Sequence, residues 1–283
     1  MVSQSSRKSV RIGLAAGLAV LMAPALVPPG ASAIDPAAVG PHAVAPGTSA
    51  ARAPKARLLK PNLVVLKAND LYIQRTSSGR YLRFESGLGN IGRGPIEVRP
   101  NTNRPCPSGR HHATQIIYRD VDGSKHFRRD VDTRIGRRSA GCMIFHPAHN
   151  HWHFEAASRY TLFQPGRERD LVKVARRKMS FCLRDSERVP ARYGTFHQPE
   201  FYGACSKYSP QGISVGWVDI YQSFLAGQAL KLPRNTRNGL YCLMIRVDPK
   251  DQLLEGNDRD NTSMRAFRLQ GDRIAVRPAR RCA

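Results

Sequence analysis

The feature that most constrains the fold is a succession of short runs from Pro61 onward, each rich in β-branched and aromatic residues and flanked by turn signals. Such runs are typical of β-strands. Asp122-Gly123 follows one of them, and Asn238-Gly239 precedes another, as hairpin turns do. Few segments have the period of a helix. The sequence therefore predicts an all-β fold, an antiparallel β-sandwich with long loops and few short helices.

Residues 1–33 have the pattern of a secretory signal peptide. A charged start (Arg7, Lys8 and Arg11) precedes an apolar core at 13–27, and Ala-Ser-Ala at 31–33 is a small-residue cleavage site. The core is too short and too interrupted by Pro to be a permanent anchor, and no second long apolar run follows. We therefore expect a secreted, extracellular protein without a transmembrane anchor.

Two further regions follow this segment. Residues 34–60 are rich in Ala and Pro and show no periodic pattern, which predicts a disordered linker. Residues 61–283 carry the strand-like runs and are expected to form the folded domain.

The six cysteines suit an exported protein, since their number is even and none forms a C-x-x-C pair. This favours three disulfides over a thiolate metal site. Six cysteines allow about 15 pairings, and their spacing alone selects none of them.

The formal net charge is +24. Such a charge favours anionic partners, for example cell-envelope polymers or acidic proteins, although a merely solvated basic surface is the alternative. No nucleic-acid-binding motif accompanies the charge, so no nucleic-acid partner is expected.

The most specific chemical signal is a histidine cluster, His149, His151 and His153. In an extended strand, alternate residues point to one face, so the three imidazoles would form a preformed metal site. Imidazole suits copper(II) or zinc, and three histidines with an open position are typical of a catalytic centre. His146 is a candidate further ligand or second-shell group.

Four motifs in this order make the chain resemble the catalytic domain of lysyl oxidases, copper-dependent amine oxidases, over roughly residues 61–269. They are "HNHWHFEAASRYTLF" at 149–163, "KMSFCLRDS" at 178–186, "QGISVGWVDIY" at 211–221 and "YCLMIRVDPKDQLLEGNDRDN" at 241–261.

The resemblance implies a chemistry and the residues that carry it. His149, His151 and His153 would bind copper, and Lys178 and Tyr221 would be the precursors of the cofactor lysine tyrosylquinone. The protein would then oxidise primary amines, including peptidyl lysine, to aldehydes with dioxygen, releasing ammonia and hydrogen peroxide. Asp219 precedes Tyr221 by two positions and is a candidate general base or hydrogen-bond partner.

The resemblance also implies a structural calcium ion, held by hard oxygen ligands from the acidic loop and the early "PNL" segment. Asn62 and Asn257 stand where Asp is more usual, which would weaken the site, and a simply solvated acidic turn is the alternative. The candidate ligands are Asn62, the Leu63 carbonyl, Glu255, Asn257, Asp260 and Asn261.

The chain departs from the animal members at several positions. Arg159 and Ala148 replace a His and a Cys of that pattern, and the usual nearby partner of Cys182 is missing. A bridge between Cys142 and Cys205 is expected, because these cysteines flank the histidine strand and the tyrosine segment. The departures leave the metal and cofactor residues in place.

Two other functions fit the same residues. A non-catalytic metal-binding sandwich, such as an adhesion or copper-holding module, would bind metal and form no quinone. A zinc hydrolase would need a carboxylate base, and Glu155 is the acidic residue nearest to the histidines in sequence.

Overall fold

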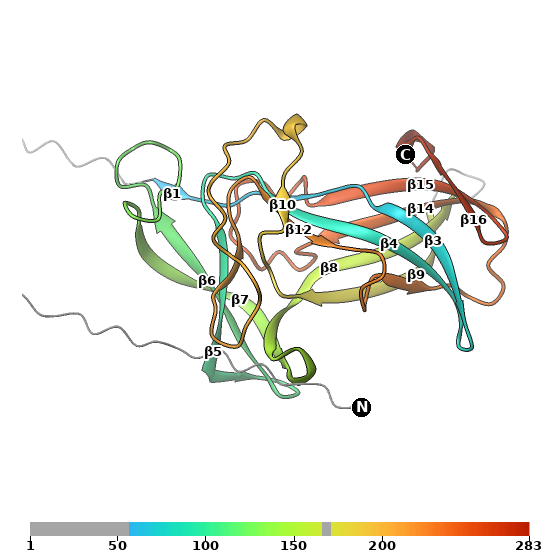
Figure 1. Ribbon diagram of the computed structural model, residues 1–283, viewed down its shortest axis with the longest axis horizontal. Coiled ribbons are helices and arrows are strands. Elements are labelled where there is room, and N and C mark those ends of the chain that lie inside the picture. The colour runs from blue at the N-terminus through green and yellow to red at the C-terminus, as the bar shows by residue number, and fades with distance from the viewer. Residues whose placement is uncertain (1–56, 166–170, 283) are drawn as a thin grey trace, which may run out of the picture. The chain divides into compact units, whose positions relative to one another are not determined.

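The computed structural model describes residues 57–165 and 171–282 (Figure 1). The predicted signal peptide (1–33) and most of the predicted linker (34–60) lie outside these ranges. The last linker residues do not: Leu58–Leu59 form a short strand, β1, and Leu59 is buried. The folded chain therefore begins slightly before the expected boundary at Pro61. None of the helical turns in the described ranges is long or apolar enough to span a bilayer.

The described chain is built of strands joined by turns and loops, which confirms the all-β prediction. The strands are β1 Leu58–Leu59, β2 Leu63–Val65, β3 Asn69–Thr76, β4 Gly79–Asn90, β5 Ile96–Cys106, β6 Arg110–Arg119, β7 Thr133–His146, β8 His151–Pro165, β9 Leu171–Phe181, β10 Glu187–Arg188, β11 Gln211–Ile213, β12 Trp217–Tyr221, β13 Ala229–Lys231, β14 Gly239–Val247, β15 Thr262–Gln270 and β16 Arg273–Arg277. Short 3₁₀ turns lie at η1 Pro147–His149, η2 Ala191–Tyr193 and η3 Ala279–Cys282.

The strands form two antiparallel sheets. The larger runs β11-β5-β6-β7-β8-β14-β15-β16, with β1 beside β6 and β9 beside β8. The smaller runs β10-β12-β4-β13, with β2 and β3 also on β4. Buried residues of both sheets share one apolar core, in which the rings of Phe84 and Tyr160 meet edge to face at 4.8 Å. The predicted sandwich is thus formed by β4 of one layer facing β8 of the other.

Strand β8 joins two parts of the large sheet. Its first residues pair with β7, so that Phe154 lies opposite Met143. Its later residues pair with β9 and β14, so that Tyr160 lies opposite both Arg177 and Ile245. Strands β5, β6 and β7 therefore form an arm on one side of the sandwich, seen at the left of Figure 1. The candidate metal ligands lie at the turn that joins β7 of this arm to β8.

Three disulfides close the fold, as the cysteine count predicted, but one expected pairing is wrong. The bridges are Cys106–Cys142, Cys182–Cys205 and Cys242–Cys282. The expected Cys142–Cys205 bridge is absent because Cys142 lies within the arm. Its neighbour there is Cys106, with a Cα–Cα distance of 6.3 Å. Cys182 directly follows β9. The long loop after it folds back and brings Cys205 beside Cys182.

Candidate active site

The histidine cluster lies at the turn between β7 and β8. His151 and His153 are in β8, but His149 ends the 3₁₀ turn η1. The following residue, Asn150, has a left-handed conformation, with φ of 52°. The expectation that all three histidines share one extended strand is therefore wrong, because the chain must reverse between the two strands. The reversal nevertheless brings the ligands together.

The three imidazoles converge closely enough to bind one ion. One ring nitrogen from each of His149, His151 and His153 lies within 4.8 Å of the others. The Nε2 atoms of His151 and His153 are 3.0 Å apart. Metal–nitrogen bonds are about 2.0–2.1 Å long, so nitrogens this close together can reach the same ion. Imidazole nitrogens are ligands that suit copper(II) as well as zinc. The donors thus fit copper.

Burial favours the neutral form of His151 and His153. The pKa of His153 is lowered to about 4, first by burial and then by the neighbouring His151, His146 and His149. Burial also lowers the pKa of His151. A neutral imidazole has a free nitrogen lone pair, which is the form that binds a metal ion.

His146, the candidate further ligand, stacks on the cluster. Its ring lies 4.1 Å from that of His149, with 17° between the planes. The cluster of converging nitrogens consists of the other three histidines, so His146 packs against a ligand.

Glu155, the candidate base of a hydrolase, already forms an ion pair. Glu155 accepts a hydrogen bond from Arg110, with 2.7 Å between Oε2 and Nη1. A carboxylate held in an ion pair is less available to approach a metal-bound water. This contact disfavours the zinc-hydrolase reading.

Packing on the opposite face holds the β7–β8 turn to the sandwich. Trp152 points away from the histidines and is buried against Phe145, with 5.3 Å between ring centroids. The Gln211 side chain donates a hydrogen bond to the Trp152 carbonyl at 2.5 Å. The glutamine that opens the third motif therefore fixes the strand that carries the histidines.

Tyr221 ends β12 inside the sandwich. Its ring stacks on Phe181 at 4.0 Å, and its hydroxyl donates to the Cys182 carbonyl at 2.7 Å. Burial raises the pKa of Tyr221 well above its ordinary value, and Asp219 and Tyr160 add to this. The phenol is therefore held in its protonated form at neutral pH.

Asp219 is buried two residues before Tyr221, and the two line a small cavity of about 10 Å³. Oδ1 accepts a long hydrogen bond from Ser186 at 3.4 Å, and Oδ2 has no partner among the described residues. Burial raises the pKa of Asp219 well above its ordinary value, and the nearby Arg184 only partly opposes this. A buried carboxyl whose pKa is shifted in this way is typical of functional sites.

Lys178 is not brought into contact with Tyr221. It is exposed in β9, opposite Arg159 of β8. Its neighbours Met179 and Phe181 pack towards the core, and alternate residues of a strand face opposite sides. The lysine therefore lies on the outer face of the sheet and the tyrosine on the inner side.

Sequence reasoning missed the residue that assembles these motifs. Asp185, within "KMSFCLRDS", is buried and accepts hydrogen bonds from the Tyr202 amide at 3.0 Å and from the Ser214 amide and hydroxyl, each at 2.7 Å. A third backbone donor is Phe201 at 2.9 Å. One carboxylate thus ties the second motif to the third.

The candidate calcium ligands form one connected group. Asn62 donates to Asp260 at 3.0 Å, and Glu255 accepts from the Leu63 amide at 2.8 Å and from Asn261 at 2.6 Å. Three buried oxygens have no partner in the described chain, namely Oδ1 of Asn62, Asp260 and Asn261.

These orphaned oxygens are hard donors of the kind calcium binds, so the group fits such an ion. Burial raises the pKa of Glu255 to about 8. Asn257 lies apart: it is exposed, and its Oδ1 accepts from the Arg259 amide at 3.2 Å.

Comparison with known proteins assigns the chain to a family. The family model described as lysyl oxidase matches residues 130–279, which is more than half of the chain. The chain belongs to the lysyl oxidase family. The match contains all four motifs, and membership supports a lysyl oxidase-like function.

Curated relatives agree with this assignment. Lysyl oxidase homolog 3 of Homo sapiens is 28% identical over 154 residues, 53% of this chain and 18% of the relative. Lysyl oxidase homolog 2 of Xenopus tropicalis is 30% identical over 147 residues, 51% of this chain and 17% of the relative. The chain therefore spans about a fifth of the length of these relatives.

Proposed function

We propose that this lysyl oxidase family member is a secreted copper-dependent amine oxidase. It acts on primary amines, including peptidyl lysine, and uses a lysine tyrosylquinone made from Lys178 and Tyr221. The observation that carries the proposal is the convergence of His149, His151 and His153, with two ring nitrogens 3.0 Å apart. Copper and the quinone would supply the two-electron oxidation of an amine to an aldehyde, with dioxygen as electron acceptor and ammonia and hydrogen peroxide as co-products.

The protein's own groups have distinct tasks in this proposal. The three histidines would hold the metal at the turn between β7 and β8. Tyr221 is oriented by its hydrogen bond to the Cys182 carbonyl and by the ring of Phe181. The free Oδ2 of Asp219 takes and returns a proton beside Tyr221, because burial raises the pKa of this carboxyl.

The crosslink requires a local rearrangement of β9. Lys178 faces outward, whereas the neighbouring Met179 contacts the core and approaches Gly227, where an added Cβ would lie 2.4 Å from the Met179 methyl. Turning Lys178 inward therefore displaces Met179 from this contact. We propose that this end of β9 changes conformation during maturation.

Peptide mapping by mass spectrometry tests the proposal directly. The secreted form is loaded with copper, exposed to air and digested. The peptides that contain Lys178 and Tyr221 are expected as one crosslinked, oxidised species. Lys178→Arg is the matched control, because it retains the charge and the histidines but has no primary amine to add. Separate peptides in copper-loaded wild-type protein would contradict the quinone.

The second candidate is a non-catalytic copper-holding sandwich. The outward position of Lys178 favours it, since the metal ligands are complete without that residue. It predicts full copper binding without crosslinked peptide or hydrogen peroxide. A histidine variant, His153→Ala, should reduce copper retention under either function, whereas Tyr221→Phe should abolish only the oxidase activity.

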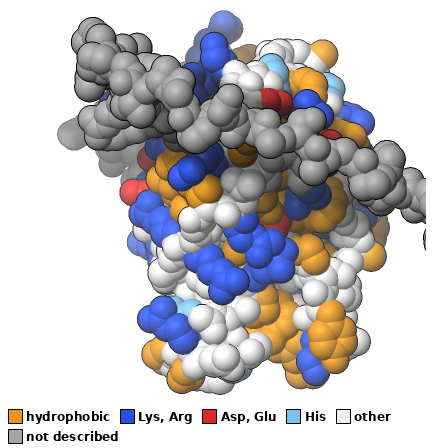
Figure 2. Space-filling model, turned by 90° about the vertical axis from the view of Figure 1, so that its left-hand side faces the viewer, with side chains coloured by type: hydrophobic (Ala, Val, Ile, Leu, Met, Phe, Trp, Pro, Cys, Tyr) orange, Lys and Arg blue, Asp and Glu red, His pale blue; other side chains and the backbone are white. Residues whose placement is uncertain are grey.

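The charge of the surface points to an acidic substrate or envelope polymer. Figure 2 shows Lys and Arg side chains gathered on one face with few acidic ones. Arg99, Arg104 and Arg137 line a depression of about 460 Å³ that includes no acidic residue among its described walls. We propose that lysines in acidic surroundings are favoured, because opposite charge steers association. Their oxidation should then slow with salt more steeply than that of neutral lysine peptides; equal salt dependence would contradict the preference.

A further inference from the structure

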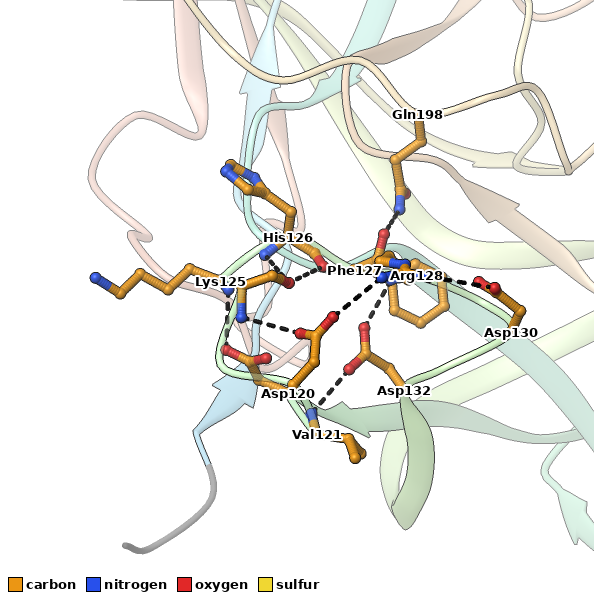
Figure 3. Close-up of polar contacts among 11 residues, drawn as sticks. Asp120, Val121, Lys125, His126, Phe127, Arg128, Asp130, Asp132 and Gln198 are labelled. Atoms are coloured by element: carbon orange, nitrogen blue, oxygen red, sulfur yellow. Dashed lines mark hydrogen bonds and ion pairs between the residues drawn. The ribbon is translucent and has the colours of Figure 1, made fainter.

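A second acidic cluster lies in the loop 120–132, between β6 and β7. Asp120, Asp122 and Asp132 each place one carboxylate oxygen within 4.8 Å of the others. Figure 3 shows the side chains of Asp120 and Asp132 in this loop. Asp120 and Asp132 are each only 6% exposed. The cluster belongs neither to the histidine site nor to the Asn62–Asn261 group, and most of the loop precedes the family match at 130–279.

Hydrogen bonds satisfy most of these oxygens, with one exception. Asp132 accepts from the Val121 amide at 2.9 Å and from the Arg128 amide at 2.6 Å. Asp120 accepts from the Lys125 amide through Oδ2, at 3.0 Å. The other oxygen of Asp120, Oδ1, is buried and has no partner in the described chain. A buried charged oxygen without a partner is unfavourable and calls for a ligand.

Neighbouring cations do not neutralise the buried carboxylates. Arg128 contacts only the outer carboxylates, Asp122 at 3.3 Å and Asp130 at 3.5 Å, and its side chain is 54% exposed. The Lys125 ammonium extends away from the cluster (Figure 3). Among the described residues, neither Asp120 nor Asp132 has an ion pair within 4.0 Å.

We propose that the loop 120–132 binds a calcium ion through Asp120, Asp122 and Asp132. All three donors are hard carboxylate oxygens, which calcium prefers and which suit copper poorly. Calcium–oxygen bonds are about 2.3–2.6 Å long, so oxygens within 4.8 Å of one another can reach the same ion. Backbone carbonyls and water complete the coordination.

The ion would fasten the arm to the rest of the protein. Asp132 immediately precedes β7, whose far end leads into the histidine turn. The carbonyl of Phe127, in the same loop, accepts a hydrogen bond from the Gln198 side chain. Bound calcium would therefore stabilise the start of β7 and the contact between the loop 120–132 and the loop that carries Gln198. Its main effect would be to order the loop 120–132.

Calcium titration of the full exported protein tests this site separately from the Asn62–Asn261 group. Bound calcium is measured by equilibrium dialysis in wild type, Asp120→Asn, Asp260→Asn and the double variant. In wild type we expect calcium dissociation constants of about 10⁻⁴–10⁻³ M. Asp120→Asn should raise the dissociation constant of one class of sites at least tenfold, both in the wild-type protein and in the Asp260→Asn variant. Asp130→Asn is the matched control, because Asp130 lies in the same loop outside the cluster and should leave binding unchanged.

Limited trypsin digestion supplies a second readout at the loop itself. Lys125, Arg128 and Arg129 lie inside it, so calcium should slow cleavage after them in wild type and Asp130→Asn at least tenfold. Asp120→Asn and the milder Asp122→Asn should lose this protection. Unchanged calcium binding and unchanged loop protection in both variants would overturn the proposal. So would loss of all calcium binding on Asp260→Asn alone.

Discussion

Glu97 and Asp219 are both carboxylates inside the protein, in opposite surroundings. Glu97 in the arm is fully buried and accepts hydrogen bonds from the Tyr118 hydroxyl at 2.8 Å, the Tyr202 hydroxyl at 2.9 Å and Arg99. Burial alone would raise its pKa, but these bonds outweigh burial and lower it. The charge of Glu97 is thus stabilised by the fold.

Asp219, beside Tyr221, is as deeply buried but poorly satisfied. Its nearest hydrogen bond is the long one from Ser186, its Oδ2 is free, and burial raises its pKa. A buried carboxylate with a complete set of donors stabilises a structure, whereas one without them is maintained at a cost in stability and is typical of a reactive site. The arm and the tyrosine site are therefore expected to respond in opposite directions when their carboxylate is removed.

The largest effect is expected in the arm. Glu97→Ala leaves two tyrosine hydroxyls without an acceptor and Arg129 without its ion pair, at 3.5 Å in the folded protein. Breaking a buried charged network in this way costs about 3–5 kcal/mol of unfolding free energy. Urea denaturation of the copper-free protein measures it. Arg99→Gln, which removes a partner whose side chain is 41% exposed, should cost about 1 kcal/mol or less. A loss below 1 kcal/mol for Glu97→Ala would mean that the network does not hold the arm.

The opposite sign is expected at the tyrosine site. Asp219→Asn replaces a buried, poorly satisfied carboxyl by a group that cannot ionise, and it should raise the unfolding free energy by about 1–3 kcal/mol at neutral pH. Amine oxidation should fall by about 10²–10⁴-fold if Asp219 transfers a proton. Denaturation and peroxide release, measured on the same preparation, check both. A destabilised variant would place Asp219 with Glu97 as a structural group.

The stability gain of Asp219→Asn should depend on pH in a defined direction. The folded-state pKa of Asp219 lies above that of the unfolded chain, which is about 3.9. The stability contributed by the protonated carboxyl is therefore fully present below about pH 3.9 and is lost as pH rises through the folded-state pKa. The advantage of the variant should accordingly be greatest at high pH and vanish in acid. A pH-independent difference would show that Asp219 does not titrate differently on folding.

The sandwich itself was predictable because its strands bury one face. Strand β14, Gly239–Val247, places Tyr241, Leu243 and Ile245 in the core, and the sequence shows this strand as a short continuous apolar run. Strand β7 was missed because it begins with exposed, charged residues such as Arg134 and Arg137. Strand β7 pairs with β6 over most of its length, but its sequence has no regular apolar pattern that would reveal this pairing.

The convergence of the three histidines was predictable from their spacing, but their conformation was not. Spacing placed three histidines together, but the turn that sets His149 apart from His151 depends on where β7 ends. The outward position of Lys178 follows from its apolar neighbours Met179 and Phe181, which alternate with it. The motif resemblance identifies Lys178 and carries no information on its orientation.

The role of Asp185 was out of reach of sequence reasoning. Its hydrogen-bond donors lie at 201, 202 and 214, in segments that only the folded chain brings to it. The wrong Cys142–Cys205 pairing has the same origin. Both depend on the path by which the long loops come back to the sandwich. Such paths leave little trace in the local pattern of the sequence.

The smallest effect tests whether the arm depends on the shape of a cation as well as on its charge. The Arg129 guanidinium lies over the Phe201 ring at 3.3 Å and donates to the Tyr202 hydroxyl at 2.9 Å. Arg129→Lys keeps the charge but loses the planar guanidinium group that makes both contacts. This should lower the unfolding free energy by about 1–2 kcal/mol. Arg128→Lys, next to it and mostly exposed, should change stability by about 0.5 kcal/mol or less. Equal stability of the two variants would mean that Glu97 needs only a positive charge nearby. The arm would then differ from the tyrosine site only in that its buried carboxylate has a cation beside it.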